Sequence, residues 1–353
     1  MSESGRLKKI LNAFQGRTSA LIQVHNNPDP DAIGSAVGLR DLFKKFLNVE
    51  SRIVFGGIVG RAENRAMLRL LEIKIVPAHK VDYSEADLLA LVDTQPGLGH
   101  DSIPDSRKPD IVIDHHPPRS EFDGIGYWDV GRPYGATSTI VSELYLDNKV
   151  PMTEQVATAL LYGIKSDTHD LGEDANKQDR EAYVRLLDQA DTSILAQIEN
   201  APVPPPYFAV FKRAIENAIV YDFACVSHLG KIDNPDMVAE VADFLMRCED
   251  LRWTMVTAIY GHTLHLSLRS VDKNAHAGSV ARKAVGVMGF AGGHGRMAGG
   301  QIPLGDADKK TRMEVVNAVT QLFLDTVKAK RTLSRSLAEG VLPDETDTRG
   351  LFE

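Results

Sequence analysis

The segment Ser19–Val24, with the sequence SALIQV, runs directly into the polar stretch His25-Asn26-Asn27-Pro28-Asp29-Pro30-Asp31. A short, mostly apolar run bounded by turn residues is typical of a buried strand. The apolar residues of Ala32–Leu47 then recur at helical spacing. We therefore predict a strand followed by a helix, with polar side chains gathered at the carboxyl end of the strand.

The same alternation continues through the first half of the chain. Further short apolar runs are predicted as strands at Arg52–Phe55, Ile73–Val76, Leu88–Val92 and Ile111–Ile113. Helices are expected near Ala136–Asp147, Thr153–Ile164 and Lys177–Ala190. Thr137 or Ser138 is expected to cap the first of these helices. Strands that alternate with helices indicate βαβ units, so we predict an α/β fold with an N-terminal doubly wound, mostly parallel sheet.

Acidic and imidazole side chains follow three of these strands and one of these helices. They lie in the segments His25–Asp31, Asp93-Thr94, Asp114–Pro117 and Lys165–Asp170. Taken singly they have structural explanations, because His25, Asp29 or Asp93 could close a turn or cap a helix. In an open α/β sheet, however, the carboxyl ends of the strands meet where ligand sites form. Four such clusters at matching positions predict one shared site.

The side chains of this predicted site suit a divalent cation. They include four carboxylates and several imidazoles but no thiolate, which favours Mn²⁺ or Mg²⁺ over metals that prefer sulfur. A single cation would leave several acids crowded together, which raises their pKa values. Two cations about 4 Å apart would need a shared carboxylate and could activate a shared hydroxide against phosphorus. Two metals therefore account better for the number of ligands.

A proline-rich stretch, Ala201–Pro206 (APVPPP), separates this half of the chain from the next. Four prolines in six residues exclude a helix interior or a central strand and favour a semi-rigid linker. We predict a metal-binding catalytic domain at residues 1–200, the linker at 201–206, a smaller mixed α/β substrate-binding domain at 207–330 and a tail at 331–353, with the active cleft between the two domains. The second domain is predicted to contain strands at Asp222–His228, Arg252–Tyr260 and Thr263–Arg269, and helices at Met237–Arg247, Asn274–Met288 and Lys310–Lys330.

The glycine cluster Gly292–Gly300 is the main candidate for a binding feature in this second domain. Glycine lets a backbone approach a ligand closely and present N–H groups to an anion. A loop that merely ends the preceding helix would explain the glycines alone. The cluster also contains His294 and Arg296, which can both pair with phosphate, and these favour an anion site.

The composition excludes several classes of protein. Of the 353 residues, 43% are hydrophobic and 25% charged, which is ordinary for a globular chain. The 40 Lys and Arg against 48 Asp and Glu give a net charge of −8, which argues against coating long nucleic acid, since such binding rests on Lys and Arg. No apolar run reaches the ~18 residues that a membrane span needs. The two cysteines, Cys225 and Cys248, form no metal or disulfide pattern, so we expect a cytoplasmic protein.

The polar clusters resemble the four ordered motifs of the DHH phosphoesterases. These are His25-x-x-x-Asp29-x-Asp31-x-x-Gly34-Ser35, then Asp93, then Asp114-His115-His116-Pro117, and finally Ser166-Asp167-Thr168. In the second half, Leu266–Ser270 and Gly292–Gly300 resemble the DHHA1 domain of that superfamily. The group to which the chain is most similar is the bacterial nanoRNase and 3′-phosphoadenosine-5′-phosphate phosphatase group. The chain departs from the family pattern at His169, where relatives commonly have glycine, and at Ala291, which replaces the first of three glycines.

The resemblance implies a role for each matching residue. His25 and Asp29 would bind one Mn²⁺, and Asp93 would bridge to a second. Asp31, His115 and Asp167 would complete the second site, with Mg²⁺ or Co²⁺ as substitutes. His116 would contact the scissile phosphate or protonate the leaving oxygen, and Asp114 would orient its neighbours. The expected substrate-binding residues are Arg269, Ser270, Gly292, Gly293, His294, Gly295 and Arg296.

The expected function is manganese-dependent hydrolysis of short oligonucleotides, of linear dinucleotides or of the 3′-phosphate of a nucleoside bisphosphate. The family also implies a homodimer, in line with the general frequency of two-fold assemblies. One alternative is an inorganic pyrophosphatase or exopolyphosphatase, with which the metal domain alone is compatible. Relatives with that activity carry a different second domain. Another alternative is a non-catalytic nucleotide-binding regulator, which would have lost a metal ligand.

Overall fold

The computed structural model describes residues 5–14, 16–172, 175–272, 274–332 and 334–338. The chain divides into two compact units, Met1–Pro202 (unit 1) and Val203–Glu353 (unit 2), each with its own sheet. The division falls inside the proline-rich stretch. The last two residues of that stretch begin helix α8 (Pro205–Glu216) and do not extend the linker. A helix accepts proline at its first positions because their N–H groups have no partner within the helix.

Unit 1 is built around a sheet of six parallel strands, in the order β3-β2-β1-β4-β5-β6. The strands are β1 (Ser19–Val24), β2 (Glu50–Phe55), β3 (Ile75–Pro77), β4 (Leu88–Val92), β5 (Ile111–Asp114) and β6 (Tyr127–Val130). This order is that of a doubly wound sheet, so the predicted fold class is confirmed. The sequence pattern missed the edge strand β6, in which Trp128 is exposed between buried neighbours.

The strand order reverses between β1 and β4, at the centre of the sheet. From β1 the chain winds outward through α2 (Pro30–Leu47), β2 and α3 (Ala62–Leu70) to the edge strand β3. It then returns to β4, which pairs with the free side of β1 so that Val92 lies opposite Val24. Ligands of doubly wound sheets bind beyond the carboxyl ends of the strands at this reversal.

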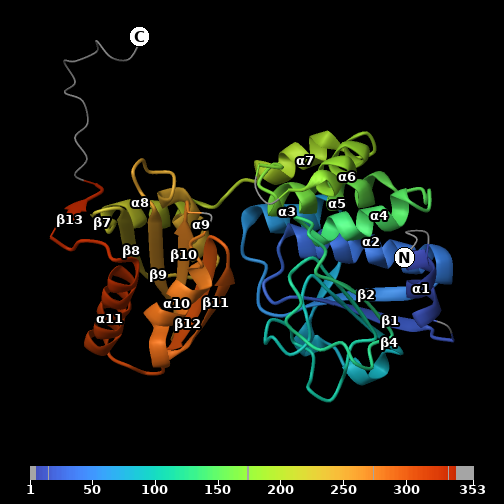
Figure 1. Ribbon diagram of the computed structural model, residues 1–353, viewed down its shortest axis with the longest axis horizontal. Coiled ribbons are helices and arrows are strands. Elements are labelled where there is room, and N and C mark those ends of the chain that lie inside the picture. Colours follow the sequence, from blue (N-terminus) through green and yellow to red (C-terminus); the bar gives the residue numbers. More distant parts are fainter. Residues whose placement is uncertain (1–4, 15, 173–174, 273, 333, 339–353) are drawn as a thin grey trace, which may run out of the picture. The chain divides into compact units, whose positions relative to one another are not determined.

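The helices of unit 1 cover one face of the sheet (Figure 1). They include α1 (Arg6–Ala13), α4 (Thr137–Leu146), α5 (Glu154–Asp167), α6 (Lys177–Leu187) and α7 (Thr192–Glu199). The sequence pattern missed α7, which begins at its own N-cap, Asp191. The opposite face carries a smaller apolar cluster, in which Leu21 and Leu89 pack with Tyr83 from a short 3₁₀ turn.

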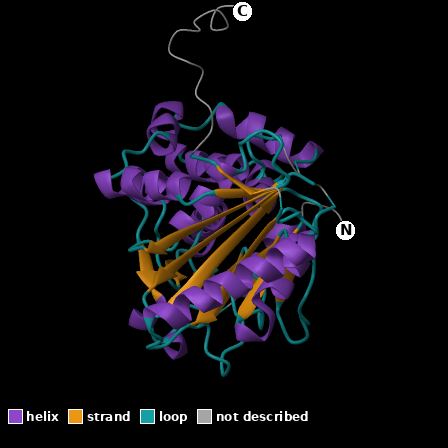
Figure 2. Cartoon of the chain, turned by 90° about the vertical axis from the view of Figure 1, so that its left-hand side faces the viewer, coloured by secondary structure: helices purple, strands orange, loops and turns teal. Residues whose placement is uncertain are grey.

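Unit 2 has a mixed sheet of seven strands, in the order β11-β12-β10-β9-β8-β7-β13. The strands are β7 (Ile219–Tyr221), β8 (Ala224–Lys231), β9 (Trp253–Tyr260), β10 (Thr263–Ser270), β11 (Phe290–His294), β12 (Met297–Pro303) and β13 (Ser334–Ser336). Only β8 and β9 pair in parallel. Helices α10 (Ala277–Val285) and α11 (Lys309–Val327) pack on one face, and α8 and α9 (Met237–Leu245) on the other. Figure 2 shows strands side by side, with helices in front of them.

The glycine cluster forms a hairpin in this sheet and is not a loop. β11 and β12 pair antiparallel, with His294 opposite Met297. A Cβ atom on Gly293 would lie 2.3 Å from the carbonyl oxygen of Met297, and one on Gly278 of α10 would lie 2.2 Å from that of Gly293. Glycine in a strand commonly marks such a close approach of two backbones. Gly293 therefore serves packing within the hairpin, and Gly278 serves the packing of α10 against it.

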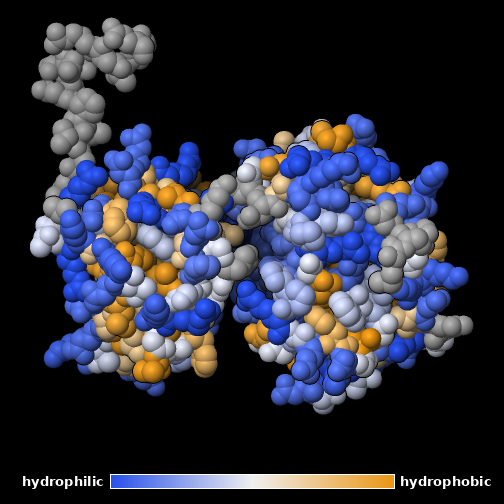
Figure 3. Space-filling model, in the orientation of Figure 1, coloured by the Kyte–Doolittle hydropathy of each residue, from blue (hydrophilic) through white to orange (hydrophobic). Residues whose placement is uncertain are grey.

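The sheet of unit 2 extends past residue 330, because β13 pairs with β7. Of the predicted tail at 331–353, residues 333 and 339–353 lie outside the described residues. Within the described part of the chain, no helix combines the length and the apolar character needed to cross a membrane. The face of unit 1 in Figure 3 is mostly hydrophilic, with separate apolar spots.

Candidate metal centre

The predicted ligands converge at the carboxyl ends of the central strands. His25 and Asp93 directly follow β1 and β4, while Asp29 is the N-cap of α2. His115 follows β5, and Asp167 is the last residue of α5. Their ligand atoms fall into three overlapping groups, each within 4.8 Å: His25, Asp29 and Asp93; Asp31, His115 and Asp167; and Asp93, His115 and His116.

The first group places the imidazole of His25 between two carboxylates. Its Nε2 lies 3.4 Å from Oδ2 of Asp29 and 3.6 Å from Oδ2 of Asp93. Its Nδ1 lies 2.9 Å from the carbonyl oxygen of Asn26. A carbonyl only accepts, so Nδ1 carries the proton and Nε2 turns its lone pair toward the carboxylates when the ring is neutral. This is the form of histidine that binds metals.

The second group repeats this arrangement around His115. Its Nε2 lies 3.4 Å from Oδ2 of Asp167, and its Nδ1 lies 2.9 Å from the carbonyl oxygen of Tyr134. The Nε2 atom is buried and has no hydrogen-bond partner among the described residues. An unsatisfied buried nitrogen is costly. A cation held with Asp31 and Asp167 would satisfy it.

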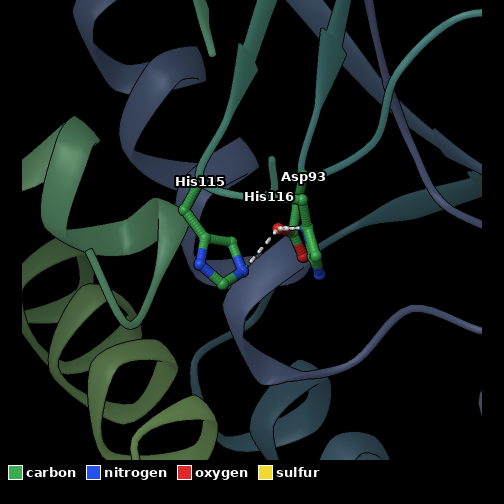
Figure 4. A group of neighbouring side chains, drawn as sticks. All are labelled: Asp93, His115 and His116. Atoms are coloured by element: carbon green, nitrogen blue, oxygen red, sulfur yellow. Dashed lines mark ion pairs between the residues drawn. The ribbon is translucent and has the colours of Figure 1, made fainter. Parts of the chain in front are cut away.

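Asp93 lies between the two groups. Its Oδ2 faces His25, while its Oδ1 lies 3.8 Å from Nε2 of His115 and 3.8 Å from Nδ1 of His116 (Figure 4). The backbone of Asp93 is left-handed, with φ of 58°. Such a conformation is uncommon in a residue other than glycine, and it is concentrated at functional sites. One carboxylate thus offers an oxygen to each group.

The charges of the centre leave an excess of negative groups. Burial raises the pKa of Asp93 well above its ordinary value, and the carboxylates of Asp31 and Asp29 raise it further. Burial and the carboxylate of Asp29 also raise the pKa of Asp167 well above its ordinary value. Burial lowers the pKa of His25, but Asp29 outweighs it, and the pKa rises to about 9. Carboxylate oxygens suit hard cations and imidazole suits intermediate ones, so the residues present fit divalent metals.

Asp31 is held by the start of helix α4. Its two carboxylate oxygens accept hydrogen bonds of 2.7 Å from the backbone N–H groups of Thr137 and Ser138. The hydroxyl of Thr137 donates to Oδ1 of Asp93 at 2.7 Å. Ala136 is the N-cap of α4, so the prediction that Thr137 or Ser138 caps this helix is wrong. Both residues hold the carboxylates of the metal centre.

His116 is oriented by Asp114, as the family resemblance implies. Nδ1 of His116 lies 2.8 Å from Oδ1 of Asp114, and its backbone N–H donates to the same oxygen at 3.1 Å. The buried side chain of Gln95 donates to the other oxygen of Asp114 at 2.7 Å and accepts from the backbone N–H of Arg119 at 2.7 Å. Sequence reasoning missed Gln95. Its position two residues after Asp93 is the only local signal.

The expected substrate-binding residues lie in unit 2, at the ends of β10, β11 and β12. Arg269 forms an ion pair with Asp243 of α9 through two nitrogens, and its Nη1 donates to Oγ of Ser267 at 2.8 Å. The hydroxyl of Ser270 donates to the carbonyl oxygen of Arg252 at 3.0 Å. The remaining candidates, Gly292, Gly293, His294, Gly295 and Arg296, occupy the tip of the β11–β12 hairpin. The guanidinium of Arg269 is therefore already paired within its own unit.

A parallel sheet with carboxylates and imidazoles at its strand reversal, followed by a mixed α/β unit, defines a metal-binding α/β protein of two units. The model of the DHH family, N-terminal domain, matches residues 19–164, and that of the DHHA1 domain matches residues 219–325. The chain therefore belongs to the DHH/DHHA1 phosphoesterase family, and the resemblance noted in the sequence is confirmed.

Three curated proteins are similar to this chain. An uncharacterized protein of Methanocaldococcus jannaschii is 34% identical over 88% of this chain and 63% of its own length. The "Probable bifunctional oligoribonuclease and PAP phosphatase NrnA" of Streptococcus mutans is 30% identical over 46% of this chain and 49% of its own length. The "Probable manganese-dependent inorganic pyrophosphatase" of Lactobacillus johnsonii is 30% identical over 48% of this chain and 54% of its own length. The chain thus spans about half to 63% of these relatives.

Among solved structures, an exopolyphosphatase-related protein from Bacteroides fragilis superimposes with a TM-score of 0.71. The match covers 92% of this chain and 98% of that one, at 16% sequence identity. At this identity the likeness establishes the shared fold.

Proposed function

We propose that this protein is a phosphoesterase that uses two divalent cations, with Mn²⁺ preferred, to hydrolyse short oligonucleotides or the 3′-phosphate of a nucleoside bisphosphate. The observation that carries the proposal is the position of Asp93, which offers Oδ2 to the group of His25 and Oδ1 to the group of His115. Two cations that share one carboxylate are typical of centres that hydrolyse phosphate esters.

The residues of the metal centre have separate roles in the proposed reaction. His25, Asp29 and Asp93 would hold one cation, and Asp31, His115 and Asp167 would hold the other together with Asp93. When bound, the cations would polarise a phosphate oxygen and lower the pKa of a water. The surrounding carboxylates would keep this pair of charges in place.

His116 would supply a proton to the leaving oxygen. Its Nδ1 donates to Asp114, so Nε2 is the nitrogen that would exchange a proton with the leaving oxygen. The side chain of His116 is 34% exposed, so the ring can reach a substrate that enters from solvent.

The proposed substrate class rests on the family and on unit 2. A relative named as an oligoribonuclease and PAP phosphatase is 30% identical over 46% of this chain, and unit 2 carries the DHHA1 domain. We propose that Arg269, Ser270 and the hairpin residues from Gly292 to Arg296 bind the substrate. The net charge of −8 disfavours a long polyanion, since little of the surface can neutralise it.

A hydrolysis assay tests this proposal directly. The chain is incubated with a dinucleotide, with 3′-phosphoadenosine-5′-phosphate and with pyrophosphate, each with Mn²⁺, with Mg²⁺ and with a chelator. We expect turnover of at least one of the two nucleotide substrates, abolished by the chelator. If the protein binds Mn²⁺ and yet hydrolyses neither nucleotide substrate, the proposal fails.

The competing function is that of an inorganic pyrophosphatase, since one relative carries that name and is also 30% identical over 48% of this chain. Release of phosphate from pyrophosphate much faster than from any nucleotide would favour it. A non-catalytic regulator is disfavoured because all six expected ligands are present and converge. Retention of every measured activity in Asp93→Ala would favour the regulator.

We also propose that the protein acts as a cytoplasmic homodimer, on the basis of the family and the frequency of two-fold assemblies. Light scattering tests the assembly, with twice the 38.7 kDa mass of the chain as the expected value. A mass of one chain at assay concentrations would contradict a dimer.

A further inference from the structure

A buried carboxylate outside the metal centre, that of Asp179, is not explained by the roles assigned so far. It is the third residue of α6 and is fully buried. With Asn176 it forms a capping box, in which Oδ2 of Asp179 accepts from the N–H of Asn176 at 2.8 Å. A capping box satisfies the first N–H groups of a helix, and the helix dipole favours an acid there. These contacts alone would be structural.

Two further hydrogen bonds of Asp179 come from outside its own helix. The backbone N–H of Gly135 donates to Oδ2 at 2.8 Å, and the hydroxyl of Thr139 donates to Oδ1 at 2.6 Å. The side chain of Asn176 also donates to the carbonyl oxygen of Pro133. The start of α6 therefore holds residues 133–139 in place by hydrogen bonds. Residues 133–136 lead into α4, and residues 137–139 form its first turn. Figure 1 shows α4 and α6 on the same side of the sheet.

Residues 133–139 also orient the second metal group. The carbonyl oxygen of Tyr134, next to Gly135, accepts from Nδ1 of His115. Thr137, two residues after Gly135, accepts the backbone N–H of His115 on its hydroxyl at 3.1 Å. The position of this backbone thus decides whether His115 keeps its proton on Nδ1 and its lone pair on Nε2.

Helix capping alone does not explain why a carboxylate is buried at position 179. No cationic side chain of the described residues pairs with it, and burying an unpaired carboxylate is costly unless several donors satisfy it. A carboxylate can accept all three donors, whereas an asparagine has one acceptor oxygen and would turn its NH₂ group toward donors. A residue that only caps a helix does not need to accept three hydrogen bonds.

We propose that Asp179 is a positioning residue of the metal centre, which holds the Tyr134 carbonyl against Nδ1 of His115 so that Nε2 remains a metal ligand. This inference rests on the proposed metal centre. Outer partners of a ligating histidine fix its tautomer, and their loss typically weakens metal binding ~10–100-fold.

The first test uses the metal-free protein and needs no activity. Nitrogen NMR of ¹⁵N-histidine protein reports the tautomer of His115, assigned with His115→Gln. We expect the Nδ1–H tautomer in the wild type and a mixture with the Nε2–H tautomer in Asp179→Asn. Calorimetric titration with MnCl₂ should show one binding step weakened ~10–100-fold in the same variant.

Asp87→Asn is the matched control. Asp87 accepts from the backbone N–H groups of Thr18 and Ser19 at 2.9 and 3.1 Å and from the hydroxyl of Thr18 at 2.8 Å, but at the amino end of β1. It should lower stability without changing the tautomer of His115 or the affinity for Mn²⁺. A folded Asp179→Asn protein with the wild-type tautomer and the wild-type titration overturns the proposal.

Thr139→Val keeps the test available if Asp179→Asn does not fold, because it removes a single donor. The same tautomer shift, smaller in size, is expected, and Thr139→Ser should restore the wild-type signal. A wild-type tautomer in Thr139→Val together with unaltered Mn²⁺ affinity would count against the proposal. A failed nucleotide assay would leave the tautomer result unaffected, so the two failures are distinguishable.

Discussion

The hydroxyl oxygen of Thr137 lies 2.7 Å from Oδ1 of Asp93, the carboxylate oxygen that faces His115. The same hydroxyl accepts the backbone N–H of His115, so its own proton is directed to Asp93. We predict that Thr137→Val, which removes this hydroxyl at nearly constant shape, weakens Mn²⁺ binding ~10–100-fold. Titration calorimetry measures the effect. Thr137→Ser is the control and should bind within a few-fold of the wild type, and equal loss in both variants would contradict the argument.

Replacing the shared carboxylate of Asp93 should weaken metal binding without lowering the stability of the metal-free protein. Asp93→Asn relieves the repulsion among buried acids, so the metal-free protein should melt at an equal or higher temperature than the wild type. Excess Mn²⁺ should raise the melting temperature of the wild type by mass action but leave that of the variant nearly unchanged. Differential scanning calorimetry with and without MnCl₂ checks both. Equal metal-induced stabilisation in the two proteins would show that Asp93 is not shared.

The glycine at position 163 lets three helices meet beside Asp31. A Cβ atom there would lie 2.2 Å from Oγ of Ser138 and 3.1 Å from Cα of Asp31. Gly163→Ala should therefore cost roughly 1–3 kcal/mol of unfolding free energy, measured in urea, and should also weaken Mn²⁺ binding. Gly38→Ala is a matched control, since its Cβ would meet Val141 Cγ1 at 2.7 Å, away from the ligands. It should lose stability and keep Mn²⁺ affinity. Unchanged Mn²⁺ binding in Gly163→Ala would refute this explanation.

An ion pair at the far end of the sheet predicts a pH dependence of stability. Burial raises the pKa of Asp110, but the N–H of Leu89 and the guanidinium groups of Arg17 and Arg107 outweigh it, so the pKa is lowered. A lowered pKa means that the ionised form stabilises the fold above the unfolded-state value and that this contribution disappears as the pH falls through the folded-state value. Asp110→Asn should therefore lose ~1–3 kcal/mol of unfolding free energy near neutral pH.

Urea unfolding of wild type and Asp110→Asn at several pH values checks this prediction. The difference between the two proteins should shrink as the pH falls below about 4, the ordinary pKa of an aspartate, and then through the lowered pKa of the folded-state carboxylate. A difference that stays constant down to acidic pH would mean that the charge of Asp110 contributes nothing.

The ion pair between Arg269 and Asp243 predicts how variants of either residue change the KM for a dinucleotide. If Arg269 contacts a phosphate, Arg269→Gln should raise the KM for a dinucleotide about tenfold or more with little change in kcat. Asp243→Asn frees the guanidinium from its partner and should lower that KM. Initial-rate kinetics with a dinucleotide measure both variants, with pyrophosphate as the control substrate. Unchanged KM values in both would remove Arg269 from the substrate site.

Local patterns predicted most of the regular structure of unit 1 because its central strands are uniformly apolar. Leu88–Val92 is predicted with the bounds that the structure has, since every residue of β4 is buried. The edge strand β6 has half-exposed character, and α7 is short, so neither carries a strong local period. The hairpin pairing within the glycine cluster was also not predicted from the sequence. Backbone approach to a neighbouring strand is a property of the partner and has no signature in the glycines themselves.

The sequence by itself determined which side chains the centre contains and where they lie relative to the strands. Parallel strands bring their carboxyl ends together, so acids and imidazoles after β1, β4 and β5 had to converge. Only the tertiary structure decided that Asp93 turns Oδ2 toward His25 and Oδ1 toward His115, and that Tyr134, Thr137 and Asp179 hold the ligands in place. Those supports act through backbone groups and single hydroxyls supplied by segments distant in the chain. Such contacts depend on how the helices pack, and no local pattern of residues encodes them.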